Sequence, residues 1–323
     1  MPGSGARERL PVLILTGPTG AGKSDWAIRL AECAPVEIVS VDSALVYRGL
    51  DIGTAKPPRA VRASVPHHLI DICDAAESYS AGRFVTDAAE CIREIHGRGR
   101  VPLLVGGTML YLRALLDGLA SLPQAAPELR RELDARAAAL GWPALHAELT
   151  RLDPVAAGRI APNDSQRIQR ALEVFYTAGA PISQLQGSTG SALEGYEVGY
   201  WRVAPSDRAL LHERIARRFE AMMTAGFLDE VRSLRDRGDL TPSHPSMRAV
   251  GYRQLWAHLD GRYGLEEAVM RAIAATRQLA KRQLTWMRAE ARGTWLDLSS
   301  EAAWRELICH KLAAAGVLST GTC

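Results

Sequence analysis

The feature that most constrains this chain is a phosphate-binding loop close to its start. A short apolar run, Val12 to Leu15, predicts a buried strand, and the sequence GPTGAGKS follows it at residues 17–24. These residues fit the pattern G-x-x-x-x-G-K-[ST] in full. In that pattern, glycines let several backbone N–H groups face one anion, the lysine adds a charge, and the last hydroxyl suits Mg²⁺. The sequence therefore predicts a site for a di- or triphosphate. Its residues are Gly17, Pro18, Thr19, Gly20, Ala21, Gly22, Lys23 and Ser24, and Ser24 is the candidate metal ligand.

Strands and helices alternate over the first part of the chain. Apolar runs at residues 36–41 and 101–105 predict two further buried strands, and residues 68–72 predict a short one. This alternation is typical of an α/β fold with a parallel, doubly wound sheet. In such sheets, ligands bind at the carboxyl ends of the strands. We therefore expect Asp42 and Thr108, which follow two of these strands, to lie beside the phosphate loop.

The alternation then gives way to long helical stretches. We expect a P-loop catalytic core at residues 10–123, continued by residues of about 196–205 and 286–317. Within the last of these segments, residues 293–298 predict a strand and 304–314 an amphipathic helix. The intervening stretches, about 124–195 and 206–285, are expected to be helical insertions. The expected architecture is an α/β P-loop sheet with a helical insertion module, and either stretch could be the module that moves.

Composition limits the class of protein. The chain has 323 residues, of which 47% are hydrophobic and 23% charged, and these values are ordinary for a globular protein. A net charge of +3 is too small to require a nucleic-acid partner, so any basic surface must be local. Five cysteines without a C-x-x-C pair argue against a disulfide scaffold or a zinc site. We expect a cytoplasmic protein with no membrane span.

Asp42 has three possible roles when only its position is considered. It could act as a general base toward a substrate beside the bound phosphate, it could hold a water of Mg²⁺, or it could cap the following turn. Thr108 follows two glycines at the next strand end. Its hydroxyl is expected to cap the following helix, and it could also point into the ligand crevice.

Three arginines follow the strand-like segment at about 196–205. Arg214, Arg217 and Arg218 lie on one predicted helix. In kinases of this architecture, such arginines clamp the transferring phosphates. At least one of the three is expected to face solvent, and Arg217 or Arg218 is the candidate clamp.

Basic and aromatic residues gather in three helical segments. Arg167 and Arg170 share the exposed face of a predicted helix, opposite an apolar stripe. A second basic stripe falls within residues 277–288, and the sequence GYRQLW stands at residues 251–256. Each segment alone is typical of a solvated helix face. Together they suggest a surface for an RNA backbone, with groups able to contact unpaired bases.

At this point the chain resembles the bacterial tRNA dimethylallyltransferase (tRNA isopentenyltransferase) family. The resemblance extends over nearly the whole chain. The phosphate loop is generic, whereas SVDS followed by GTAKP, and GYRQ followed by TRQLAKRQ, are specific to the family. The motifs that carry the resemblance are GPTGAGKS at 17–24, SVDSALVYRGLD and GTAK within 40–56, GGTMLY at 106–111, PNDSQRIQRALEV at 162–174, GYRQLW at 251–256 and ATRQLAKRQLTW at 275–286.

The resemblance implies an alkyl transfer rather than a phosphoryl transfer. The dimethylallyl group of dimethylallyl diphosphate would move to N6 of adenosine 37, beside the anticodon of tRNAs that read codons starting with U. Diphosphate would leave. The resemblance also implies Mg²⁺ as cofactor and the tRNA anticodon stem-loop as partner, and the enzyme is expected to be a monomer. It assigns catalytic roles to Asp42, Thr108 and Lys23 and a diphosphate contact to Arg218.

The resemblance further implies a set of residues that contact tRNA. They come from the strand ends, from the first helical stretch and from the two motifs of the second stretch. The set is Asp42, Ser43, Ala44, Leu45, Thr108, Arg130, Gln166, Arg167, Ile168, Gln169, Arg170, Gly251, Tyr252, Arg253, Gln254, Leu255, Trp256, Lys281, Arg282, Gln283, Trp286 and Arg288.

Other functions share parts of this pattern. A nucleotide or small-molecule kinase would use ATP at the same loop. An adenylate isopentenyltransferase would act on free AMP, although a free nucleotide needs no basic helical surface. An RNA-binding protein without activity is disfavoured because Lys23, Ser24 and Asp42 are all present. A requirement for an allylic diphosphate rather than ATP would distinguish the tRNA prenyltransferase from the kinase.

Overall fold

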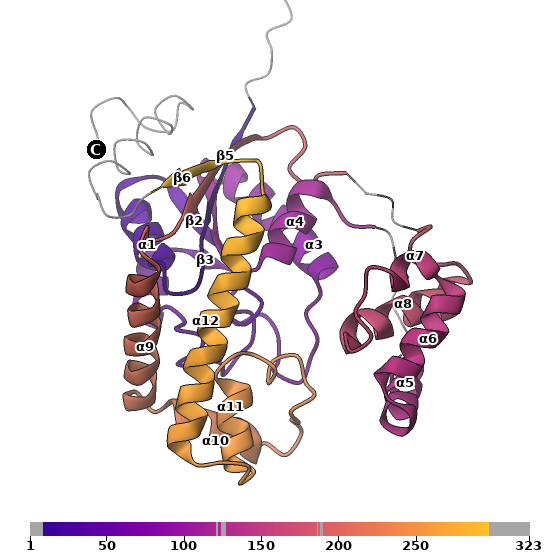
Figure 1. The fold of residues 1–323 in the computed structure, drawn as a ribbon. Helices are drawn as coiled ribbons and strands as arrows, with labels where there is room; N and C mark the ends of the chain where they lie inside the picture. Colours follow the sequence, from indigo (N-terminus) through magenta and orange to yellow (C-terminus); the bar gives the residue numbers. More distant parts are fainter. Residues whose placement is uncertain (1–8, 121, 124–126, 186, 188–189, 297–323) are drawn as a thin grey trace, which may run out of the picture. The chain divides into compact units, whose positions relative to one another are not determined.

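The structure is a computed structural model that describes residues 9–120, 122–123, 127–185, 187 and 190–296 (Figure 1). Its chain divides into two compact units. The larger unit combines Met1–Leu116 with Ala192–Cys323, and the smaller unit is Asp117–Ser191. The helix predicted at residues 304–314 and the end of the strand predicted at 293–298 lie outside the described residues.

A parallel sheet organises the larger unit, and this confirms the predicted fold class. In the described part of the chain the sheet has six strands, and all of its pairings are parallel. Across the sheet their order is β3 (His67–His68), β2 (Val36–Val41), β4 (Val101–Gly106), β1 (Pro11–Thr16), β5 (Glu197–Val203) and β6 (Thr294–Leu296).

Helices cover both faces of the sheet. Alternate residues of β1 enter different cores because side chains alternate along a strand. Leu13 packs into the core beneath α1 (Lys23–Cys33), whereas Ile14 packs into the core formed with α3 (Ala81–Gly97) and α4 (Met109–Asp117). β1, β2 and β4 are buried along their whole length. Their carboxyl ends therefore carry the polar residues that can reach a ligand.

The strand predicted at residues 68–72 is wrong beyond its first residue. After α2 (Arg59–Ser64), only His67 and His68 pair with β2. Leu69 and Asp71 adopt φ angles of 60° and 59°, which lie in the left-handed region and cannot continue a strand. The carboxylate of Asp71 binds Lys56 and Arg62 instead.

Four further helices belong to the larger unit. They are α9 (Arg208–Thr224), α10 (Phe227–Asp236), α11 (Tyr252–Leu259) and α12 (Leu265–Ala289). α12 packs against α9 and α11 and runs without interruption across residue 286, where we expected the core to resume. The helical stretch expected at 206–285 thus forms one compact unit with the sheet.

The smaller unit is helical. Its elements are α5 (Pro127–Leu140), α6 (Trp142–Leu152), α7 (Pro154–Ala157) and α8 (Ser165–Ala178). They enclose a core of their own, and α8 is capped by Asp164, whose carboxylate accepts the N–H of Arg167 at 3.3 Å. This unit corresponds to the first helical stretch, which we expected at about 124–195.

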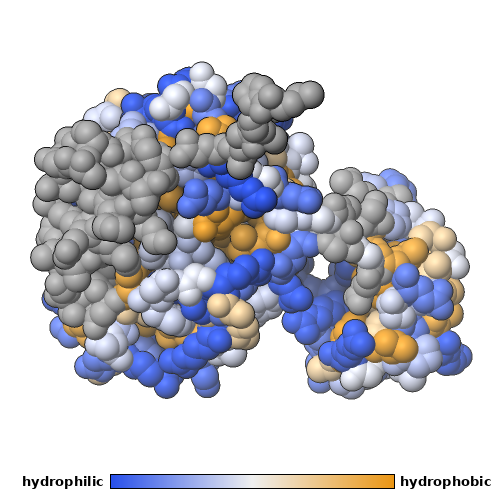
Figure 2. Space-filling model, turned by 90° about the horizontal axis from the view of Figure 1, so that it is seen from above, coloured by the Kyte–Doolittle hydropathy of each residue, from blue (hydrophilic) through white to orange (hydrophobic). Residues whose placement is uncertain are grey.

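The surface shown in Figure 2 mixes hydrophilic and hydrophobic side chains on each unit. Among the described residues, no helix combines the length and the apolar character that crossing a membrane requires.

Candidate active site

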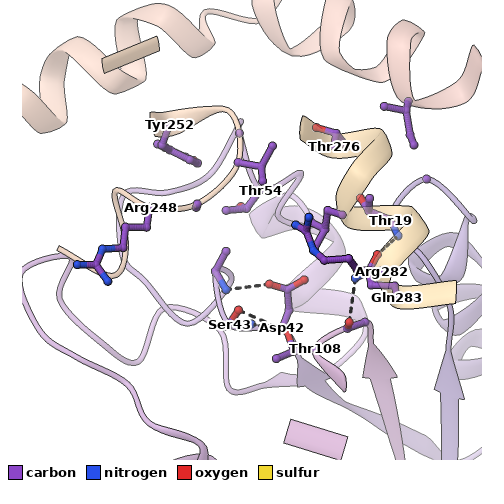
Figure 3. A pocket seen from close by; sticks show the side chains of 18 of the residues that line it. Thr19, Asp42, Ser43, Thr54, Thr108, Arg248, Tyr252, Thr276, Arg282 and Gln283 are labelled. Atoms are coloured by element: carbon purple, nitrogen blue, oxygen red, sulfur yellow. Dashed lines mark hydrogen bonds between the residues drawn. The ribbon is translucent and has the colours of Figure 1, made fainter. Parts of the chain in front are cut away.

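A cavity of about 550 Å³ opens in the larger unit at the carboxyl ends of the strands. Its size is typical of a small-molecule site. Residues far apart in the sequence line it, from the phosphate loop, the β2 and β4 ends, the 53–54 turn, α9 and α12. Figure 3 shows Asp42 and Thr108 at its base, with Thr19 and Gln283 on one side and Arg248 and Tyr252 on the other.

The phosphate loop connects β1 to α1, as predicted. Gly17 must be glycine because a Cβ there would lie 2.4 Å from the carbonyl oxygen of Val203 on β5. Gly20 and Gly22 adopt positive φ angles of 81° and 87°. Lys23 and Ser24 are the first two residues of α1, so the positive end of this helix and the lysine charge meet at the loop.

Asp42 and Thr108 lie beside each other at the strand ends. The Oδ1 atom of Asp42 accepts the N–H of Ala44 at 2.8 Å and that of Leu45 at 3.4 Å. The Thr108 hydroxyl accepts the N–H of Ser43 at 3.0 Å (Figure 3). Asp42 thus caps the following turn, and its half-buried carboxylate also lines the cavity. These two roles are compatible.

Two positive charges lie close to the Asp42 carboxylate. Removal from solvent, opposed by Asp42 and reinforced by nearby Arg218, lowers the pKa of Lys23 to about 8. Burial likewise lowers the pKa of Arg218, again opposed by Asp42. Arg218 lines the cavity, whereas Arg217 is 65% exposed and pairs with Glu213 at 3.4 Å. Arg218 is therefore the arginine placed to bind an anion here.

Glu230 of α10 holds the turn that faces Arg218. Its carboxylate accepts three backbone N–H groups, from Asp51 at 3.0 Å, Ile52 at 2.6 Å and Gly53 at 3.2 Å, and it also accepts the Tyr252 hydroxyl. One residue further on, the carbonyl of Thr54 accepts the Arg218 guanidinium at 3.3 Å. This turn therefore helps to orient the anion-binding arginine.

Gln283 of α12 joins two loops of the site. Its Oε1 accepts the N–H of Thr19 in the phosphate loop at 2.9 Å, and its Nε2 donates to the carbonyl of Gly107 at 2.8 Å (Figure 3). The cavity has one side lined by the P-loop and Arg218, and a strand-end side lined by Asp42 and Thr108.

Comparison with known proteins assigns the chain to a family. The family model described as IPP transferase matches residues 45–290. The chain belongs to the IPP transferase family. It is 60% identical over 298 residues to the tRNA dimethylallyltransferase of Bordetella petrii, covering 91% of this chain and 95% of the relative. It is 58% identical to the enzyme of the same name from Methylococcus capsulatus, covering 90% and 94%.

Solved structures of the IPP transferase family share the fold. The full-length tRNA isopentenylpyrophosphate transferase from Bacillus halodurans matches with a TM-score of 0.68 at 38% identity, covering 96% of this chain and 97% of that one. A eukaryotic dimethylallyltransferase acting on tRNA matches with a TM-score of 0.77 at 26% identity, covering 96% and 81%.

Several residues that the family resemblance assigned to tRNA contact lie in the core instead. Tyr252, Leu255 and Trp256 are at most 5% exposed, and Gln254 is 6% exposed. The Gln254 side chain accepts the N–H of Gly251, which is also buried. Only Tyr252 of this segment lines the cavity. The assignment of Gln254, Leu255 and Trp256 to an RNA surface is wrong because α11 packs this face against α10 and α12, whereas the contact expected of Tyr252 stays a prediction.

Other predicted contacts of this IPP transferase family member remain accessible. Arg253, Lys281 and Arg288 are exposed, and so is Ser43, whereas Ala44 and Leu45 are half-buried. Arg282 and Trp286 line the cavity, and Trp286 is 42% exposed with Arg113 stacked 5.7 Å above its ring. A base could stack on such an indole.

In the helical unit, Arg167, Arg170 and Arg159 line a hollow of about 290 Å³. Arg167 is exposed, as are Gln166 and Arg130, while Gln169 and Arg170 are half-buried. Ile168 is wrong as an RNA contact because it is fully buried in the core of this unit.

Arg130 already forms an ion pair within the helical unit. Its guanidinium makes a two-point contact with Glu173, at 2.7 and 3.1 Å, and the Glu173 side chain is buried. Arg170 also reaches Glu173, at 3.5 Å. Arg167 pairs with Asp164 at 3.5 Å, but its side chain is 67% exposed and is the most exposed of the three.

Sequence reasoning missed part of the site. Thr54, Met222 and Arg248 line the cavity, and Glu230 stands behind it. Arg248 follows a Pro-Ser-Met segment with no recognisable spacing, so only the fold brings it here. Gln283 did carry a signal: it lies on the stripe formed by Ala280, Leu284 and Met287 at i, i+3, i+4 and i+7, where a polar residue needs an internal partner.

Proposed function

We propose that this chain transfers the dimethylallyl group of dimethylallyl diphosphate to N6 of an adenosine beside the anticodon of tRNA. One observation carries the proposal: a single cavity joins a phosphate loop and the half-buried Arg218 to a strand-end carboxylate. Membership of the IPP transferase family supports it, because relatives at 58–60% identity carry the name tRNA dimethylallyltransferase. The base is adenosine 37, in tRNAs that read codons starting with U.

The residues divide the reaction between two sides of the cavity. The bond between C1 of the allyl group and the diphosphate oxygen breaks, and a bond from the adenine N6 to C1 forms. Lys23 and Arg218 stabilise the negative charge that develops on the leaving diphosphate. N6 loses a proton as it attacks, and Asp42 accepts that proton as general base. The Thr108 hydroxyl orients the adenine beside Asp42.

The donor set at the loop fits Mg²⁺. The exposed Ser24 hydroxyl and the Asp42 carboxylate offer hard oxygen atoms, and Mg²⁺ commonly binds one or two such groups together with substrate phosphates. The described residues contain no cluster of three or more His, Cys, Asp or Glu that could hold a metal ion. When bound, Mg²⁺ would neutralise charge on the diphosphate. Ser24 would hold it.

The helical unit favours RNA over a free nucleotide as acceptor. Its exposed Arg167 and the hollow beside it provide cationic surface that AMP would not need. The adenine must leave its stack to reach Asp42, at a cost of a few kcal/mol that is least in a loop. We also propose a cytoplasmic, monomeric enzyme.

The test compares donors and acceptors directly. The purified protein is incubated with Mg²⁺, with tRNA that lacks the modification or with AMP, and with dimethylallyl diphosphate or ATP. The tRNA is then digested to nucleosides, and the masses of the nucleosides and of AMP are measured. We expect a five-carbon gain on adenosine of tRNA only with the allylic diphosphate. A gain on AMP alone, or phosphate transfer from ATP, would overturn the proposal in favour of an adenylate isopentenyltransferase or a kinase.

A further inference from the structure

Gln283 lies in a motif that sequence reasoning assigned to tRNA contact, but its side-chain amide points inward. Both polar atoms of the amide are engaged, Oε1 by the N–H of Thr19 at 2.9 Å and Nε2 by the carbonyl of Gly107 at 2.8 Å. These partners belong to the two loops that meet at the base of the cavity. The contacts are complementary, since an N–H donates to the oxygen and a carbonyl accepts from the amide nitrogen.

The Thr19 contact controls more than one atom of the phosphate loop. The Thr19 N–H belongs to the same peptide unit as the Pro18 carbonyl, and a peptide unit is planar. That carbonyl accepts the Lys23 ammonium at 2.8 Å and the N–H of Ala21 at 3.2 Å. Fixing one end of this peptide therefore fixes the group that holds Lys23. Rotation of the peptide would release the lysine.

The Gly107 contact extends the same restraint to the strand-end side. A Cβ at Gly107 would lie 2.6 Å from Nε2 of Gln283, so glycine is what allows the amide to approach. The next residue is Thr108, whose hydroxyl accepts the N–H of Ser43 at 3.0 Å. One amide thus spans the loop that faces the diphosphate and the turn that faces the acceptor base.

Several contacts fix the position of α12, and with it the position of the Gln283 side chain. Four residues beyond Gln283, the carbonyl of Met287 accepts the buried Arg202 guanidinium at 2.8 Å. The same guanidinium also binds the carbonyls of Glu290 and Gly293. On the helix flank, Ala280 and Leu284 pack against Leu211 and Ile215 of α9 in a small core. The position of Gln283 is therefore set by the fold and not by a bound ligand.

We propose that Gln283 is a positioning residue that presets the phosphate loop for diphosphate and aligns it with the Thr108 turn, and that it is not an RNA contact. The inference rests on the proposed function only in taking the loop as the diphosphate site. It predicts that the amide contributes to diphosphate affinity and leaves tRNA affinity unchanged.

The test uses Gln283→Met, which keeps the length of the side chain and removes both hydrogen bonds. The matched control is Gln278→Met, because Gln278 is an exposed glutamine on the same helix and does not line the cavity. Inorganic pyrophosphate with Mg²⁺ is titrated calorimetrically into each protein, and binding of unmodified tRNA is measured in parallel. We expect Gln283→Met to raise the Kd of pyrophosphate by about 10-fold. Its tRNA Kd, and both constants of the control, should change by less than about twofold.

Gln283→Glu adds a second prediction. Its carboxylate could still accept from Thr19, but it would place an oxygen against the Gly107 carbonyl and a negative charge near the diphosphate. We expect a larger loss of pyrophosphate affinity than in Gln283→Met, and a matching rise in the KM for dimethylallyl diphosphate.

Two results would overturn the inference. Weaker tRNA binding with unchanged pyrophosphate affinity would return Gln283 to the RNA surface. Equal weakening of both ligands, with a lower melting temperature, would make its role purely structural. Because pyrophosphate binding needs no turnover, wild-type protein that binds pyrophosphate but does not prenylate tRNA would contradict the proposed function and leave the role of Gln283 intact.

Discussion

In the reaction that we propose, Asp42 and Arg218 act at its two ends, one as the base and the other on the leaving group. Asp42 caps a turn through Oδ1 and lines the cavity, so its structural and chemical roles must be separated by the choice of substitution. Asparagine keeps an oxygen that can accept from Ala44, but it is not a base at neutral pH.

We expect Asp42→Asn to lower kcat by about 10²–10⁴-fold, the usual contribution of a positioned base, with tRNA affinity nearly unchanged. The measurement is single-turnover prenylation together with equilibrium tRNA binding. Loss of tRNA binding to the same degree as activity would show that Asp42 matters only for the turn that it caps.

Arg218 and Arg217 are neighbours with opposite environments. We expect Arg218→Ala to lower kcat/KM for the allylic diphosphate by about 10²-fold, because it removes a cavity-lining cation from the leaving group. Arg217→Ala is the matched control, since Arg217 faces solvent and pairs with Glu213. Steady-state kinetics, with the concentration of dimethylallyl diphosphate varied, compares the two variants. A larger effect at Arg217 would contradict this assignment.

At the scale of elements, β2 carries a buried ion cluster that links it to β3 and to the end of α3. The Glu37 side chain is 5% exposed, and its carboxylate binds Arg98 at 2.8 Å and His68 at 2.7 Å. Burial acts to raise the pKa of Glu37, but the hydrogen bonds from Arg98 and His68 hold it below its ordinary value. The stabilisation is therefore present above the pKa of Glu37 in the unfolded chain and is lost as pH falls through its folded pKa.

We expect Glu37→Gln to lower the free energy of unfolding by about 1–3 kcal/mol at pH 7, because it weakens hydrogen bonds to a charged acceptor. The difference from wild type should shrink as the pH falls below about 4. Urea unfolding at several pH values measures it. Glu94→Gln is the control. Glu94 is 57% exposed, so its replacement should change the free energy of unfolding by less than about 0.5 kcal/mol. A difference that grows in acid would contradict the account.

Elements set by local sequence were predicted well, and contacts made by the fold were not. The strands at β1, β2 and β4 and the phosphate loop follow from short apolar runs and glycine spacing. The GYRQLW segment carries polar and aromatic groups that a sequence cannot assign to surface or core, and the packing of α11 buries most of it. The partners of Glu230 and Gln283 lie more than 170 residues away, so the sequence could not identify them, although the apolar stripe of α12 indicates that Gln283 faces inward.

At the scale of the whole molecule, we propose that the larger unit carries out the chemistry and that the helical unit binds RNA. The larger unit contains the cavity, and the helical unit carries the cationic hollow lined by Arg167. RNA affinity from such cations depends on phosphate contacts and falls with salt.

We expect Arg167→Ala to weaken binding of all substrate tRNAs to a similar degree and to reduce the slope of log K against log salt by about 1. Arg151→Ala, an exposed arginine of α6 that does not line the hollow, should leave the slope unchanged. Binding is measured at several salt concentrations. An effect confined to one tRNA would indicate base recognition instead of backbone contact.

We propose that the phosphate loop of this chain holds a leaving group and not a phosphoryl donor. The most direct measurement follows the phosphorus of dimethylallyl diphosphate by ³¹P NMR while tRNA prenylation is counted by nucleoside mass. The account predicts one intact inorganic diphosphate released for each adenosine that gains a five-carbon group, with no consumption of added ATP. Release of monophosphate, or transfer of phosphate to any acceptor, would contradict it.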